Sequence, residues 1–127
     1  MNVVDSSGWL EYFADGPGAA FFAPAIESLD TLVVPTVSLY EVFRRVAAQR
    51  DESAALTAVA LMQRGTVVDL TPPLALSAAV LASAHRLPMA DAMMLATARA
   101  HRATLWTQDA DFEGLSGVKY RPATKRR

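Results

Sequence analysis

The stretch that decides the fold is Asn2-Val3-Val4-Asp5-Ser6-Ser7, a short apolar run with a carboxylate and two hydroxyls directly behind it. Short apolar runs bounded by capping or turn-forming residues are typical of buried strands. A second run, Thr104 to Thr107, is followed after one residue by Asp109. The sequence therefore predicts two strands, each of which leads into an acidic residue at its carboxyl end.

Between these two runs, β-type and helical patterns alternate. Further strands are predicted at Leu32 to Val34 and Thr66 to Leu70, with a candidate fifth at Val118 to Tyr120. Helices are predicted over Val37 to Gln49, from Asp51 to Arg64, from Pro72 through Ala84 and from about Met89 to His101, and Gly16-Pro17-Gly18 breaks the first helical region. Because parallel strands require helical crossovers, we predict an α/β fold with a mostly parallel central sheet of 4–5 strands flanked by helices.

Length and composition favour one domain, and the absence of cysteine is compatible with a reducing compartment. The chain has 127 residues, of which 52% are hydrophobic, and it has no cysteine. It therefore has material for one core, but it has neither disulfides nor thiolate metal ligands. No stretch reaches the roughly 18 apolar residues of a membrane span, and Asp5 follows Met1 too closely for the apolar region of a signal peptide. We expect a cytoplasmic protein without a membrane partner.

The net charge of −1 conceals an uneven distribution. The first 118 residues hold seven bases against thirteen acids, a net charge of −6, and the remaining bases are Lys119, Arg121, Lys125, Arg126 and Arg127. A body of this charge is unlike that of a protein that binds nucleic acid by phosphate contacts alone. A phosphate ligand would need bridging cations or the basic end. We predict a domain at residues 1–120 and a basic tail at 121–127, either a solubilising end or a phosphate contact.

Two acids are expected at one edge of the sheet. In open parallel sheets, ligands bind beyond the carboxyl ends of strands, where Asp5 and Asp109 are placed. Each could instead be an ordinary helix cap, and Ser6 and Ser7 offer competing caps beside Asp5.

Two further acids lie within predicted helices. Helical spacing puts Asp91 on the same face as Met94 and Leu95, where a carboxylate costs several kcal/mol unless it is paired, protonated or bound to a cation. Contacts with the helix dipole are the alternative explanation, since Asp91 is in the first turn. Glu41 lies opposite the apolar stripe of its helix, so periodicity alone places it in solvent.

The order of these four acids resembles the PIN-domain nucleases, specifically VapC-type toxins of toxin–antitoxin pairs. The resemblance spans most of the chain. It rests on Val3-Val4-Asp5-Ser6-Ser7, Ser38-x-x-Glu41, Leu87-Pro88-x-x-Asp91-Ala92 and Thr107-Gln108-Asp109-Ala110-Asp111-Phe112. It implies a three-layer PIN-like sandwich and a ribonuclease, an enzyme that hydrolyses RNA phosphodiester bonds with a metal-bound water.

The resemblance also implies roles for individual residues and partners. Asp5, Glu41, Asp91 and Asp109 would be catalytic, and Asp5, Asp91 and Asp109 would hold Mg²⁺ or Mn²⁺, which prefer oxygen ligands. Ser6, Thr107 and Asp111 would support them. The implied partners are RNA, a cognate antitoxin and a second copy in a homodimer. The apolar segments Phe21 to Ile26 and Ala54 to Met62 are candidate partner surfaces, although burial in the core also explains them.

Two other functions compete with this one. A phosphatase or phosphotransfer domain could use Asp5 as a nucleophile, but such a site needs a nearby lysine and residues 1–118 have none. A catalytically silent interaction domain, whose acids are helix caps and surface charges, is the remaining alternative.

Overall fold

A computed structural model describes residues 1–124. Its elements, in chain order, are β1 (Asn2–Val4), α1 (Ser6–Phe13), α2 (Ala19–Glu27), η1 (Leu29–Thr31), β2 (Val33–Pro35), α3 (Thr36–Gln49), α4 (Glu52–Met62), β3 (Thr66–Val68), α5 (Pro72–His85), α6 (Met89–Ala100), β4 (Thr104–Thr107), η2 (Ala110–Phe112) and β5 (Val118–Tyr120). No helix among the described residues is long and apolar enough to cross a membrane. Three residues of the predicted basic tail, 125–127, lie outside the described part.

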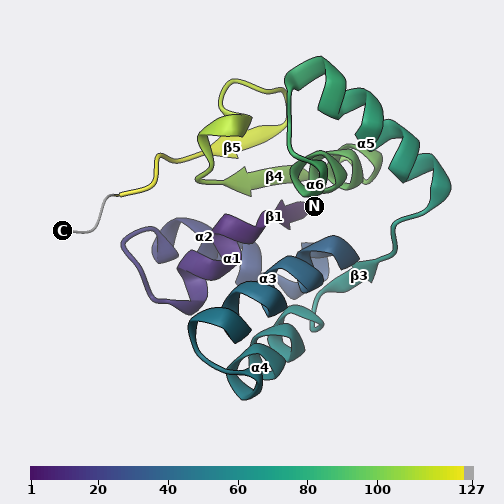
Figure 1. Cartoon of the computed structure of the whole chain (residues 1–127). Coiled ribbons are helices and arrows are strands. Elements are labelled where there is room, and N and C mark those ends of the chain that lie inside the picture. The colour runs from purple at the N-terminus through teal and green to yellow at the C-terminus, as the bar shows by residue number, and fades with distance from the viewer. Residues whose placement is uncertain (125–127) are drawn as a thin grey trace.

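All the strands run parallel. One ladder has the order β1-β4-β5 and a second pairs β2 with β3. A parallel bridge between Asn2 and Leu32 joins them on the free side of β1, which gives the order β3-β2-β1-β4-β5. The predicted α/β fold with a parallel central sheet is therefore confirmed, with helices on both faces of the strands (Figure 1).

Alternation of side chains along the strands builds a separate core on each face of the sheet. Val4 and Val34 are buried with α1 to α4, whereas Val3, Val33 and Leu105 are buried with α5, α6 and η2. Successive strand residues point to opposite faces, so a short, wholly apolar strand such as β2 needs helices on both sides. This arrangement produces the predicted three layers.

Most predicted element ends agree with the structure to within two residues. Asp51 caps α4 through the Ala54 N–H at 2.7 Å, and Thr71 caps α5 ahead of two prolines. The third strand is shorter than predicted, ending at Val68, because its only neighbour, β2, pairs over three residues. β2 itself is shifted by one residue relative to the prediction.

A close approach at Gly8 holds α1 against the sheet. A Cβ added there would lie 2.6 Å from both the Val4 Cγ1 and the Phe22 Cε1 atoms. Only glycine allows the start of α1 to pass this close to β1 and α2. The helix is thereby fixed beside the residue that connects it to β1, which is Asp5.

Candidate active site

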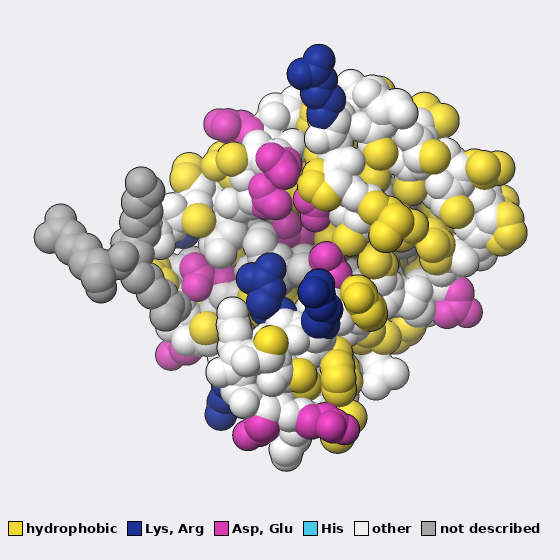
Figure 2. Space-filling view, in the orientation of Figure 1, with side chains coloured by type: hydrophobic (Ala, Val, Ile, Leu, Met, Phe, Trp, Pro, Cys, Tyr) yellow, Lys and Arg dark blue, Asp and Glu magenta, His cyan; other side chains and the backbone are white. Residues whose placement is uncertain are grey.

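The connections of the fold bring the predicted acids to one edge of the sheet. Asp5 follows β1, and Asp109 lies two residues beyond β4. α3 begins directly after β2, so Glu41 lies in its second turn near the same edge. α6 runs back toward the start of β4, which puts its first turn, with Asp91, at the carboxyl edge. Figure 2 shows Asp and Glu side chains gathered in the middle of one face.

Asp5 is 1% exposed and is held by four hydrogen bonds. Its Oδ1 accepts from the Gly8 N–H at 2.9 Å, and the Ser7 hydroxyl donates to both carboxylate oxygens, at 2.7 and 3.0 Å. Thr107 Oγ1 donates to Oδ2 at 2.6 Å. The capping interpretation of Asp5 is therefore correct as geometry, and the same contacts fix the direction of its carboxylate.

Thr107 connects two of the acids. Its hydroxyl is fully buried, donates to Asp5 and accepts from the Asp109 N–H at 2.9 Å. A hydroxyl has a single proton, so these two bonds determine its orientation. Asp109 in turn caps η2, because its Oδ1 accepts from the Asp111 N–H at 2.9 Å. The strand end thus positions three carboxylates relative to one another.

Asp91, Asp109 and Asp111 form the tightest group. One carboxylate oxygen from each lies within 4.8 Å of the others, an arrangement that could hold a metal ion. Asp91 and Asp109 are partly buried and Asp111 is exposed, so the group opens to solvent on one side. Asp5, which was predicted as a ligand, is not in this group, because its oxygens are turned toward Ser7, Gly8 and Thr107.

The Asp91 carboxylate lacks the partners that Asp5 has. The residue ahead of α6 is Pro88, which provides no side-chain cap, and within residues 1–124 no group donates a hydrogen bond to Asp91. The negative charge of Asp91 is therefore not compensated by a hydrogen-bond donor, although the side chain is partly buried. A cation would remove this deficit, since a buried charge needs a partner or a metal.

Burial and repulsion between neighbouring carboxylates raise the pKa of two of these acids. Burial, followed by the charges of Asp109, Asp5, Glu41 and Asp111, raises the pKa of Asp91 from 3.8 to about 7. Burial also raises the pKa of Asp5 to about 6, although its hydrogen bonds with Thr107, Ser7 and Gly8 oppose the increase. The four other acids therefore all act on Asp91, which identifies one electrostatic unit.

Glu41 belongs to this unit through its charge, and its carboxylate is held by Ser6. The Ser6 hydroxyl donates to Glu41 Oε1 at 2.7 Å, with the more distant Met94 Sδ as another acceptor at 3.7 Å. Periodicity placed Glu41 in solvent, but it is partly buried, because α1 lies across that side of α3. Ser6 therefore orients Glu41, while Asp5 is held by Thr107, Ser7 and the Gly8 N–H. The sequence had indicated Ser7 only as a competing helix cap beside Asp5.

The residues present suit a hard divalent cation. All the clustered side chains offer carboxylate oxygens, and exposed Asp111 makes the group accessible from solvent. Mg²⁺ and Mn²⁺ prefer such oxygen ligands and are bound through a small number of carboxylates. A cation would also stabilise the charged form of Asp91, which burial and the neighbouring acids disfavour.

Comparison with solved structures shows the same fold in proteins of low sequence identity. A toxin–antitoxin complex from Klebsiella pneumoniae aligns with a TM-score of 0.78 at 22% identity, over 94% of this chain and 96% of the other. VapC20 from Mycobacterium tuberculosis, described as a sarcin-ricin loop-cleaving toxin, aligns with a TM-score of 0.77 at 20% identity, over 94% and 99%. VapBC2 from Rickettsia felis, bound to a promoter DNA fragment, aligns with a TM-score of 0.73 at 12% identity, over 95% and 97%.

The sequence itself identifies the family. No curated protein matches the chain. The family model of the PIN domain matches residues 3–118, which include both strand-end acids and both acid-bearing helices. The chain belongs to the PIN-domain family.

Proposed function

We propose that this protein is a Mg²⁺- or Mn²⁺-dependent endoribonuclease and the toxin of a toxin–antitoxin pair, acting in the cytoplasm. The observation that carries the proposal is the Asp91–Asp109–Asp111 group in a member of the PIN-domain family: the three carboxylates converge, and no Lys or Arg within residues 1–124 forms an ion pair with them. The similarity to a toxin that cleaves the sarcin-ricin loop supports RNA as the substrate class.

The proposed reaction is hydrolysis of an RNA phosphodiester bond. Asp91, Asp109 and Asp111 would hold the cation, and Asp5 and Glu41 would complete the negative charge around it. When bound, a divalent cation lowers the pKa of a water molecule and stabilises negative charge on the phosphate oxygens.

The chain's own residues do the positioning. Thr107 holds Asp5 and Asp109 at a fixed separation, and Ser6 holds Glu41 toward the same cleft. With a pKa near 7, the Asp91 carboxyl can exchange a proton at neutral pH while no cation is bound.

An apolar groove fits the antitoxin part of the proposal. Leu10, Phe13, Val46, Ala58 and Leu61 are among the residues that line a pocket of about 310 Å³ between α1, α3 and α4. It includes part of the Ala54–Met62 segment, whose Ala55 and Met62 are core residues, whereas Leu61 is 44% exposed. An antitoxin helix would bury its apolar face in this groove.

The expected homodimer has a different candidate surface. On α5, Leu76 and Val80 are 71% and 68% exposed and lie one turn apart, and Met89 at the start of α6 is 72% exposed. Hydrophobic side chains cover this region in Figure 2. We propose that a second copy packs on this face, since large adjacent apolar side chains favour association.

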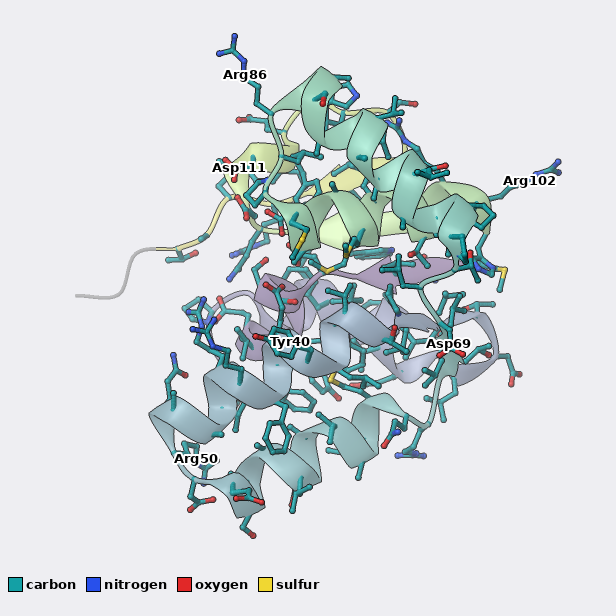
Figure 3. The ribbon with its side chains drawn as sticks, turned by 45° about the vertical axis from the view of Figure 1, so that its right-hand side comes forward. Tyr40, Arg50, Asp69, Arg86, Arg102 and Asp111 are labelled. Carbon is teal, nitrogen blue, oxygen red and sulfur yellow. The ribbon has the colours of Figure 1, made fainter. Side chains whose placement is uncertain are left out.

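The test of the enzymatic proposal is cleavage of a mixed RNA pool by the purified chain with Mg²⁺ or Mn²⁺. Asp91→Asn and a chelator should each abolish cleavage. Asp69→Asn is the matched control, because Asp69 lies on the far side of the molecule from Asp111 (Figure 3) and the substitution removes the same charge. Equal cleavage by Asp91→Asn would refute the site. Absence of both cleavage and metal binding by the unmodified chain would favour a silent interaction domain.

A further inference from the structure

A second pocket adjoins the carboxylates along α3. It has a volume of about 340 Å³ and is lined by Ser6, Leu10, Tyr40, Glu41, Arg44, Arg45 and Ala48. Two of these, Ser6 and Glu41, are joined by the 2.7 Å hydrogen bond described above, and the charge of Glu41 contributes to the raised pKa of Asp91. The pocket therefore shares Glu41 with the acidic unit, and its lining also includes two arginines.

The two arginines that line this pocket have no hydrogen-bond or ion-pair partner among the described residues. Both Arg44 and Arg45 are exposed. Glu41 lies one turn before them and would be the usual helical partner, but its Oε1 accepts from Ser6. Figure 2 shows basic side chains directly beside the magenta carboxylates.

Three other basic side chains are directed elsewhere. Arg99 donates to the Ser116 carbonyl at 3.2 Å, Lys119 lies over the Trp106 ring at 4.2 Å, and Arg102 points away from the body in Figure 3. Because residues 1–118 carry a net charge of −6, a polyanion approaching the acids needs local positive charge. Arg44 and Arg45 supply it in the pocket that adjoins the acids.

An aromatic ring completes the pocket. Tyr40 is 64% exposed and precedes Arg44 by one helical turn, so the two side chains lie on the same face of α3. Exposed aromatic rings beside basic groups are the usual platform for unpaired bases. A guanidinium group can donate two parallel hydrogen bonds to the oxygens of one phosphate.

We propose that this pocket is a nucleotide subsite for single-stranded RNA, in which Arg44 and Arg45 bind the phosphate next to the scissile one and Tyr40 stacks on its base. The subsite rests on the proposed ribonuclease function and names how that function holds its substrate. Its contribution is to binding, since the arginines lie outside the group that could hold the cation.

The test compares the double variant Arg44→Gln/Arg45→Gln with the charge-matched double variant Arg64→Gln/Arg102→Gln, using cleavage of a single-stranded RNA oligonucleotide. For the first variant, KM should rise roughly tenfold. The negative slope of log affinity against log salt concentration should become shallower by about 1.4, as expected for two lost contacts to single-stranded RNA. kcat should stay within about twofold. Arg44→Lys/Arg45→Lys should restore the slope, because it restores the charge.

Tyr40 gives an independent reading of the same pocket. Tyr40→Phe should keep RNA binding, whereas Tyr40→Leu should weaken it roughly tenfold, because stacking needs a ring. Equal KM values and equal salt slopes for the two arginine double variants would overturn the subsite while leaving the ribonuclease proposal intact. A wild-type chain that neither cleaves nor binds RNA would overturn both proposals.

Discussion

Asp5 and Asp91 are carboxylates of one electrostatic unit, but their surroundings differ. Asp5 is 1% exposed and accepts hydrogen bonds from Ser7, Gly8 and Thr107. Asp91 is only partly buried and accepts none from residues 1–124. The pKa of Asp91 is nonetheless the higher of the two, at about 7 against about 6. Hydrogen bonds thus offset burial at Asp5, whereas Asp91 depends on a ligand for compensation.

The largest effect expected outside the group that could hold the cation comes from removing the Thr107 hydroxyl, which links Asp5 to Asp109, a neighbour of Asp91. Thr107→Val keeps the shape of the side chain but leaves Asp5 Oδ2 without its donor and the Asp109 N–H without its acceptor. We expect cleavage to fall about 10- to 100-fold, as for lost support of a metal ligand, and stability to fall by about 2 kcal/mol. RNA cleavage and thermal unfolding measure the two effects.

Ser38 provides the matched control for that substitution. Its hydroxyl is also fully buried, but it has no hydrogen-bond partner among the described residues. Ser38→Ala should therefore leave stability unchanged or higher, because it removes an unsatisfied polar group. Thr107→Ser should restore most of the activity. If Thr107→Val and Ser38→Ala behave alike, the Thr107 hydroxyl does not organise the acids.

Neutralising the two compared carboxylates should change stability in opposite directions. Asp5→Ala removes the cap of α1 and leaves three donor groups unpaired, so the free energy of unfolding should fall by about 2 kcal/mol. Asp91→Asn removes a charge that burial and four neighbouring acids disfavour, so metal-free stability at pH 8 should rise. Denaturant titration without divalent cations checks both, and a loss in both variants would contradict the comparison.

A smaller effect is expected from pH alone in the metal-free protein. In the unfolded chain the Asp91 carboxyl has its ordinary pKa of 3.8, whereas in the folded protein that pKa is about 7. Between these values the folded state keeps a proton that the unfolded state has lost, so stability falls as pH rises through this window. The thermal midpoint should thus be lower at pH 8 than at pH 5, with a flatter profile in Asp91→Asn. A rise in the unmodified chain would contradict the pKa of Asp91.

The sequence predicted the layers of the fold more fully than the details of the site. Wholly apolar strands such as β2 and amphipathic helices such as α3 give clear local signals, because burial on a face depends mainly on local spacing. Strand ends were less predictable, since β3 ends where its pairing with β2 ends. The proposed boundary between residues 120 and 121 stays a prediction, although the Arg121 N–H donates to the Thr107 carbonyl.

Within the site, tertiary contacts decided what local spacing did not. The apolar stripe around Asp91 correctly indicated a carboxylate in need of compensation, because that signal lies within one helix. Glu41 was placed in solvent by its own helix and is drawn into the cleft by Ser6, which lies 35 residues earlier. The grouping of Asp111 with Asp91 and Asp109 depends on the η2 turn, which periodicity does not predict, and the role of Asp5 as a metal ligand stays a prediction.

Calorimetric titration with Mn²⁺ at pH 7.5 tests the central claim most directly, because it measures the cation site without requiring the correct RNA. The unmodified chain and Asp69→Asn should bind Mn²⁺ with equal affinity, and Asp91→Asn should bind at least about tenfold more weakly, since it loses a carboxylate of the proposed site. Equal affinity in Asp91→Asn, or no Mn²⁺ binding by the unmodified chain, would contradict the account.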